Sequence, residues 1–323
     1  MHEFGEMAAR ATRSASRAAR VAEAVATGPL GALSHDELGV IFDGLADPLE
    51  PVVAVALSST CLGLRTPLRA ALEVLKERHG RAVALCRKVG WSCAELRGAE
   101  QLNWAVEAWV EGLTAADMAT LAMILRTNGL PRLQRLNLEC NELGDAGVQA
   151  FCEGLGHGTL PSYHTLFLGG NNIGPVGAEA VAAALRRGAM SKLVTLSLLG
   201  NPLGNQGVAA LAAPLRTMPA LKQLTLNHCE IGDEGVASLV YNLGKDDFKA
   251  LETLYIGCNY MTDAGITTLA AALDAGGLPA LLNDNQEFDP FEIAWSHSFL
   301  QQHLAIASAV QAVKDALAKR SSL

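Results

Sequence analysis

The chain has 323 residues, of which 18% are charged, and a formal net charge of −8 at pH 7. This acidic balance argues against a nucleic-acid-binding protein or an anionic-membrane protein, because both need a basic surface. The seven cysteines form no CxxC motif and follow no secretory signal, which predicts a reducing, cytoplasmic compartment. No apolar run reaches the length of about 18 residues that would predict a membrane span.

Residues 1–30 differ in composition from the rest of the chain. They are rich in Ala and Ser, and their arginines recur every three or four residues, along one face of a potential helix: Arg10, Arg13, Arg17 and Arg20. This pattern resembles an organelle transit peptide. We predict a solvated, flexible tail here, and an organelle-targeting peptide is the alternative.

Residues 31–79 have the pattern of a small helical unit. Ser34 and Glu37 predict a capping box, and the Asp47-Pro48 pair should end the helix that follows it. The segment resembles an F-box at the following positions: Leu33, Glu37, Leu38, Ile41, Phe42, Leu45, Asp47, Pro48, Leu57, Cys61 and Arg65. The resemblance implies that Leu38, Ile41 and Phe42 contact a Skp-type adaptor of a ubiquitin ligase. The alternative is a helical cap that shields the end of the domain that follows.

Residues 80–130 form a junction and a degenerate first copy of the repeat that fills the next segment. With a period of 30 residues, the copy aligns as follows: Val106 with Leu136, Ala108 with Leu138, Glu111 with Asn141, and Leu113 with Leu143. Thr114 and Asp117 predict a second capping box at the start of a helix. We therefore expect a terminal coil of a repeat protein in this segment.

Residues 131–282 repeat the pattern L-x-x-L-x-L-x-x-N-x-L-G-x-x-G five times, each time followed by a run rich in small residues. The ninth positions are Asn141, Asn171, Asn201, Cys229 and Asn259, at spacings of 30, 30, 28 and 30 residues. The alternation of leucines predicts a short strand, and the run that follows predicts a helix. Repeated strand–helix units build a parallel sheet with helices on one face.

Two hydrogen-bonding roles follow from the repeat. The ninth-position Asn should bond to loop backbone in adjacent coils, which would form a ladder of buried amides. A helix N-cap is needed about four residues later, at the positions of Asp145, Asn205, Asp233 and Asp263. Pro175 takes the same slot in the second copy, where a missing N–H group is tolerated.

The five copies resemble the leucine-rich repeat family, and their spacing and G-D-x-G turns resemble its ribonuclease-inhibitor subtype. The resemblance implies an α/β fold: a curved solenoid with a concave parallel sheet, convex helices and helical caps at both ends. Residues 283–323 should contain the C-terminal cap, because residues 297–319 carry an apolar stripe at helical spacing. A partner-binding helix is the alternative for that segment.

Motifs for catalysis, cofactors or metals are not convincing. The glycine-rich residues 169–177 lack the Lys-Ser/Thr of a P-loop, and their glycines fall in register with the repeat. The histidines lack metal-ligand spacing, and Cys140 and His228 should lie too far apart for a catalytic pair. We therefore predict a protein that is not an enzyme and binds no cofactor or metal.

The predicted binding site lies on the concave face. Phe167, Leu199 and Tyr255 are apolar groups that the fold does not need there, and they form the expected centre of a protein-binding hot spot. Its expected polar rim is Arg135, Glu139, Asn227 and His228. The sequence thus favours an interaction module. The F-box resemblance implies that this module is the substrate receptor of an SCF-type ubiquitin ligase. A regulator similar to the Ran GTPase activators and a scaffold subunit of a larger assembly are the alternatives.

Overall fold

The computed structural model describes residues 35–59, 68–105, 112–127, 130–156, 163–281 and 315. The chain divides into two compact units, Met1–Ala99 with Met123–Pro131, and Glu100–Ala122 with Arg132–Leu323. The predicted tail at residues 1–30, the capping residue Ser34 and the capping helix at residues 297–319 lie outside the described residues, apart from position 315.

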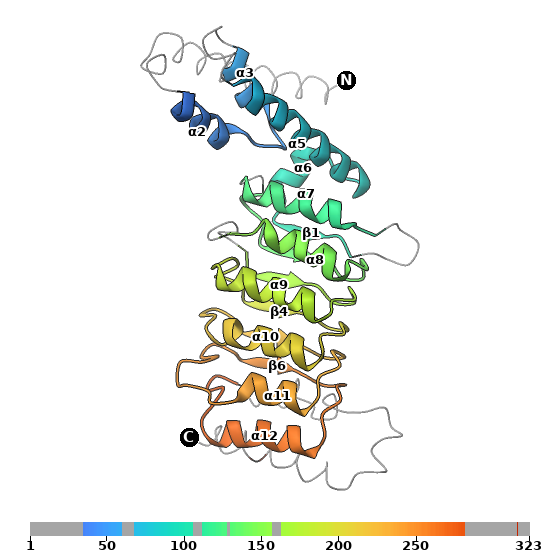
Figure 1. Cartoon of the computed structure of the whole chain (residues 1–323), viewed down its shortest axis with the longest axis vertical. Helices are drawn as coiled ribbons and strands as arrows, with labels where there is room; N and C mark the ends of the chain where they lie inside the picture. Colours follow the sequence, from blue (N-terminus) through green and yellow to red (C-terminus); the bar gives the residue numbers. More distant parts are fainter. Residues whose placement is uncertain are drawn as a thin grey trace, which may run out of the picture. The chain divides into compact units, whose positions relative to one another are not determined.

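The first unit is helical. Its helices are α2 (His35–Leu45), α3 (Val52–Ser59), α5 (Arg69–Lys88) and α6 (Cys93–Gly98) (Figure 1). One apolar cluster holds α2, α3 and α5 together, and its buried members are Leu38, Phe42, Ala46, Ala54, Leu68 and Leu75. Asp47 marks the end of α2 as predicted, and its carboxylate accepts the backbone N–H of Leu49 at 2.8 Å.

The loop between α2 and α3 is tied to α5 and α6 by polar contacts. The ring of His79 in α5 hydrogen-bonds the carbonyl of Pro48 at 2.7 Å. The guanidinium of Arg97 in α6 lies 2.7 Å from a carboxylate oxygen of Asp47 and also pairs with Glu50. The α6 helix itself begins with a capping box between Ser92 and Glu95. These contacts fix the corner at which α5 turns into α6.

The second unit is a parallel sheet of six strands in sequence order, β1-β2-β3-β4-β5-β6. The strands are β1 (Gln101–Asn103), β2 (Arg135–Asn137), β3 (Thr165–Phe167), β4 (Thr195–Ser197), β5 (Gln223–Thr225) and β6 (Thr253–Tyr255). The helices are α7 (Ala115–Arg126), which belongs to this unit as far as Ala122, α8 (Gly144–Glu153), α9 (Pro175–Arg186), α10 (Gly204–Arg216), α11 (Asp233–Val240) and α12 (Asp263–Asp274).

Helices α8 to α12 each lie beside the next and form a single layer on one face of the sheet (Figure 1). The middle residue of every strand points into this layer and is buried, as Leu136, Leu166 and Leu196 show. The residues on either side of it point to the other face, called the open face below. The strand–helix solenoid with an α/β fold is therefore confirmed.

The register predicted for the first coil is wrong. The structure pairs Leu102 with Leu136, so β1 begins four residues before the position that the period of 30 assigns to it. The later part of the coil is in the predicted register, because the N–H of Leu113 donates to Asn141 Oδ1 as that of Leu143 donates to Asn171 Oδ1. The first coil is thus longer between its strand and Leu113, and Val106, Ala108 and Glu111 lie outside the described residues.

The ladder of buried amides is confirmed. Asn171 Oδ1 accepts the N–H of Asn141 at 2.9 Å, and Asn201 Oδ1 accepts that of Asn171 at 3.0 Å. Each amide nitrogen donates to a carbonyl in its own coil and to one in the preceding coil, as Asn171 does to Leu168 and Leu138. Each Asn therefore satisfies backbone groups of the coil before it, which would otherwise be buried without partners.

Cys229 replaces one amide of this ladder. Its thiol donates to the carbonyl of Leu198 at 3.2 Å, but a sulfur is a weak acceptor for the N–H groups of the preceding coil. The N–H of Leu203 instead donates to the carbonyl of Asn201, 2.7 Å away. Burial raises the pKa of the Cys229 thiol to about 11, although the backbone N–H groups of Asn201 and Gly200 act in the opposite direction.

The predicted N-cap roles need correction. Asp145, Asn205 and Asp233 lie inside the first turn of their own helices and cap the next helix along the stack. Asp145 Oδ1 accepts the N–H groups of Gly174 and Gly177 at the start of α9. Asn205 serves α11 and Asp233 serves α12 in the same way. The acceptor is shared between coils because the helix starts lie side by side on one edge of the stack.

Pro175 and Asp263 occupy the same repeat position as Asp145, Asn205 and Asp233 but differ from these three residues. Pro175 offers no acceptor to α10, which starts without a side-chain cap. Asp263 Oδ1 is buried and has no hydrogen-bond partner in the part of the chain that the structure describes.

Candidate functional site

The open face presents one row of side chains across the sheet. The strand register aligns Asn137, Phe167, Ser197, Thr225 and Tyr255 in successive strands. Phe167 and Tyr255 are half-buried, and three strand spacings, or about 14 Å, separate them. Ser197 is only 6% exposed, since its small side chain lies between larger neighbours. The row therefore carries two aromatic side chains, Phe167 and Tyr255, with the hydroxyl-bearing residues Ser197 and Thr225 between them.

The seventh repeat position lies next to this row. Leu199 is 38% exposed, which makes it one of the large apolar side chains that reach solvent. Gly169 lies between Glu139 and Leu199, and a Cβ atom there would meet Glu139 Oε1 at 2.9 Å and the Leu199 carbonyl at 3.2 Å. The Glu139 side chain therefore leans over Gly169, into space that a larger residue would fill.

The predicted rim residues have different environments. Arg135 and His228 are exposed, and Glu139 is half-buried. Asn227 accepts the backbone N–H of Gly257 through Oδ1 at 2.9 Å, so this side chain braces the turn after β6. Arg135 lies on β2 and His228 follows β5, so the two residues belong to different ends of the row.

The turn after each strand has a left-handed backbone. The residue at the eighth repeat position has a positive φ in all five copies: Cys140, Gly170, Gly200, His228 and Cys258. Glycine adopts this conformation freely, whereas the other three residues are held there at some cost in strain. The strained turns thus place a thiol, an imidazole and a second thiol along one edge of the open face.

Tyr260 is a surface residue that the sequence reading missed. It is 70% exposed and follows Asn259 at the tenth repeat position, where other copies have Glu142, Asn172, Pro202 and Glu230. The available signal was an aromatic residue at a position where none of the other copies has one.

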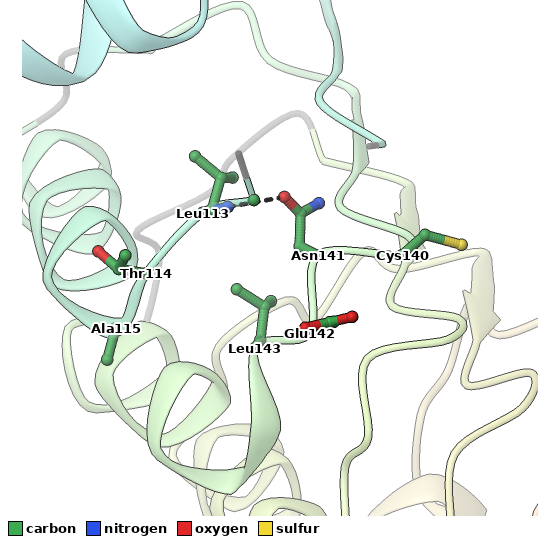
Figure 2. Close-up of a pocket in the computed structure, with 8 residues that line it drawn as sticks. Leu113, Thr114, Ala115, Cys140, Asn141, Glu142 and Leu143 are labelled. Atoms are coloured by element: carbon green, nitrogen blue, oxygen red, sulfur yellow. Dashed lines mark hydrogen bonds between the residues drawn. The ribbon is translucent and has the colours of Figure 1, made fainter. Parts of the chain in front are cut away.

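A pocket of about 380 Å³ opens between the first two coils of the second unit (Figure 2). Its lining consists of Gly112, Leu113, Thr114, Ala115, Cys140, Asn141, Glu142 and Leu143. Figure 2 shows the Asn141 amide bonded to the Leu113 N–H, with the Cys140 sulfur pointing away from Thr114. These lining residues include no His, Lys or Arg, and apart from Cys140 their one ionisable side chain is the carboxylate of Glu142.

The helix that follows this pocket confirms the second predicted capping box. Thr114 accepts the N–H of Asp117 through its hydroxyl, and Asp117 accepts the N–H of Thr114 at 2.8 Å. Both donors at the start of α7 are therefore satisfied by side chains of this chain, which explains the polar lining without a ligand.

The predicted adaptor-contact residues lie mostly inside the first unit. Leu38 is 5% exposed and Phe42 is 1% exposed, and both belong to the apolar cluster. Ile41 is half-buried and packs against it. Among the described residues of this unit, the exposed large apolar side chains are instead Val40, Val52, Val55 and Val74. An adaptor could therefore meet these valines and the edge of Ile41, but not the side chains of Leu38 and Phe42 as they are packed.

Within the described ranges, no group of three or more His, Cys, Asp or Glu side chains is placed to hold a metal ion. In the same part of the chain, no helix has both the length and the apolar character needed to cross a membrane.

No curated protein matches the chain. The sequence model of the family described as Leucine Rich repeat matches residues 130–152, 164–182, 189–212 and 218–240, which correspond to the coils of β2, β3, β4 and β5. The β6–α12 coil has the same strand and helix beyond the matched segments. Together with the parallel sheet and its amide ladder, the match shows that this chain carries leucine-rich repeats.

Proposed function

We propose that this chain is a protein-protein interaction module that binds a partner protein on the open face of its sheet. The observation that carries the proposal is the row from Phe167 to Tyr255, in which two aromatic side chains flank the hydroxyls of Ser197 and Thr225. Repeat proteins of this kind use such an extended sheet surface to bind partners.

The chemistry of the row fits a hot spot. Aromatic side chains bury a large area on binding and dominate the energetics of many interfaces. The spacing of about 14 Å between Phe167 and Tyr255 leaves room for an extended peptide segment, and the half-buried Thr225 between them can offer its hydroxyl to main-chain groups. Arg135, Glu139 and His228 supply the polar surroundings expected of an interface rim.

More specific roles stay hypotheses within this proposal. An F-box-type receptor would hold an adaptor on the first unit and a ubiquitination substrate on the repeats, which would be of the ribonuclease-inhibitor subtype. A Ran-GTPase-activator-like regulator would bind a small GTPase, and a scaffold subunit would bind other members of its assembly. Each role names a different partner, and a cytoplasmic location is compatible with all three.

The experiment uses the full chain as bait, in its wild-type form and as four variants. The wild type, Phe167→Ala, Tyr255→Ala, the double variant and Tyr241→Ala are immobilised and exposed to the same cell extract, and bound proteins are identified by mass spectrometry. Tyr241 is the matched control, because it is an exposed aromatic at the end of α11, on the helix side of the unit. The affinity of the purified partner is then measured by calorimetry.

We expect each open-face substitution to weaken binding by about 2 kcal/mol or more, and Tyr241→Ala to leave it unchanged. Thermal melting should be nearly the same for all variants, because these side chains do not fill the core. Full-affinity binding by the double variant would move the binding surface away from the open face. Recovery of a Skp-type adaptor, a small GTPase or neither distinguishes the three roles.

A further inference from the structure

Two thiols of the first unit lie close together at the corner between α5 and α6. The sulfur atoms of Cys86 and Cys93 are 3.5 Å apart. Cys86 is buried in the last turns of α5, whereas Cys93 is half-buried as the first residue of α6. The two cysteines are seven positions apart in the sequence and form no CxxC motif, so their spacing does not predict this proximity.

The backbone on both sides of this pair is fixed. Gly90 reverses the chain with a φ of 73°, and the N–H of Trp91 donates to the carbonyl of Cys86 at 2.8 Å. Ser92 and Glu95 form the capping box that starts α6 directly at Cys93. Because a disulfide bond is about 2.05 Å long, the sulfurs need to approach by only about 1.5 Å, which side-chain rotation can supply.

We propose that Cys86 and Cys93 are a modification site at which a hydroperoxide forms a reversible intramolecular disulfide. Cys93 is the more accessible thiol and reacts first: its sulfur attacks the peroxide, the O–O bond breaks, and Cys93 sulfenic acid and one water or alcohol form. The sulfur of Cys86 then attacks the sulfenic sulfur, the S–O bond breaks, and water leaves with the Cys86 proton. Two electrons from the two thiols thereby reduce one peroxide.

The environment of Cys86 assigns it the second step. Its burial and its hydrogen bond with Cys93 raise the pKa of the Cys86 thiol to about 12, which keeps it protonated and unreactive toward peroxide in solution. A sulfenic acid on Cys93 is a different target, because the corner between α5 and α6 holds it next to the Cys86 thiol.

The disulfide would act on the rest of the unit through α6. This short helix carries Arg97, whose guanidinium holds Asp47 and Glu50 in the loop between α2 and α3. A covalent bond from α6 to α5 would prevent the corner from opening and would keep Arg97 in place. Oxidation therefore should stiffen the first unit, and reduction should release it.

The test uses the reduced full chain, treated with hydrogen peroxide, alkylated and digested with trypsin without reduction. Cleavage after Arg81, Arg87, Lys88 and Arg97 places the two cysteines in separate peptides, residues 82–87 and 89–97. We expect these peptides to be joined, with a mass two hydrogens below their sum, and to separate again after dithiothreitol. The oxidised chain should also melt at a higher temperature than the reduced chain.

Cys86→Ser and Cys93→Ser should each abolish the joined peptide, while Cys140→Ser, which removes an exposed thiol elsewhere, should leave it unchanged. Recovery of residues 82–87 and 89–97 as separate peptides after peroxide treatment would overturn the proposal. Oxidation of Cys93 to sulfinic acid without cross-linking would overturn it as well. An unchanged melting temperature of the joined form would refute the stiffening of the first unit.

Discussion

The carboxylate of Asp145 accepts the backbone N–H of Gly177, 32 residues further along the chain, at 2.8 Å. The same oxygen accepts the N–H of Gly174 at 2.7 Å, so one side chain of α8 satisfies two donors at the start of α9. Helix starts leave such donors without intrahelical partners. The stack therefore closes its helix ends through the neighbouring coil, and removal of either partner should weaken both coils.

Asp145→Ala should lower the free energy of unfolding by about 0.5–2 kcal/mol, because it removes the acceptor of two N–H groups at the start of α9. Urea unfolding followed by circular dichroism measures the change. Asp263→Ala is the matched control at the same repeat position, where Oδ1 has no hydrogen-bond partner, and it should cost less. An equal loss in both variants would contradict the capping role of Asp145.

Gly177→Ala should be destabilising, by about 1–3 kcal/mol, because its Cβ atom would lie 2.6 Å from Asp145 Oδ1 and 2.7 Å from a methyl group of Ile173. Gly80→Ala in α5 is the contrasting substitution, since a Cβ atom there meets nothing within 4 Å. It should stabilise the protein by about 0.5–1 kcal/mol, as Ala is the better helix former. Melting temperatures that shift in the same direction would refute this difference between the two glycines.

Asn201→Leu should cost about 1–3 kcal/mol, because it leaves the N–H groups of Asn171 and Ile173 buried without their acceptor. The midpoint of urea unfolding measures this cost. A midpoint that does not move would reject the ladder as a source of stability.

Cys229→Asn should have the opposite effect and raise stability by about 0.5–1.5 kcal/mol. The new amide would complete the ladder between Asn201 and Asn259 and would offer its oxygen to the N–H groups of Asn201 and Leu203. The same unfolding experiment is the measure. A loss of stability would mean that the coil around Cys229 has adapted to the smaller thiol.

Alkaline pH should destabilise the protein through its buried thiols. Burial raises the pKa of Cys152 to about 12, against the attraction of Arg187, while an unfolded thiol titrates near 9. The folded-state pKa is the higher one, so this stabilisation is complete below pH 9 and is lost as pH rises from 9 toward 12. The slope for one such thiol is about 1.4 kcal/mol per pH unit. Cys152→Ala should make the fall in the free energy of unfolding between pH 8 and pH 10 shallower. If this fall is unchanged in the variant, Cys152 is not its source.

Much of the second unit could be predicted because the repeat carries its own register. The leucines and the ninth-position asparagines mark equivalent points of each coil, so the sheet, the helix layer and the ladder through Asn141, Asn171 and Asn201 followed directly. The first coil could not be aligned by the same rule, because four more residues lie between Leu102 and Leu113 than between Leu136 and Leu143, which breaks the period.

Interactions between coils were harder to predict than the coils themselves. Asp145 lies inside the first turn of its own helix, and the sequence does not show that its partners are 29 and 32 residues away. The open-face residues Phe167 and Tyr255 could be placed from their strand positions. The burial of Leu38 and Phe42 depends on the packing of α2 against α3 and α5, which the spacing of apolar residues does not determine.

The ladder and the shared caps join positions that are about one coil apart, such as Asn141 with Asn171 and Asp145 with Gly174. A duplicated coil inserted as a whole would find the same donors and acceptors on both of its sides, so the chain could lengthen without leaving a polar group unpaired. An insertion of a few residues inside a coil would instead displace each bond from its partner. The coil is therefore the natural unit of growth for this protein, and gene duplication in steps of about 30 residues is a change that its structure can accept.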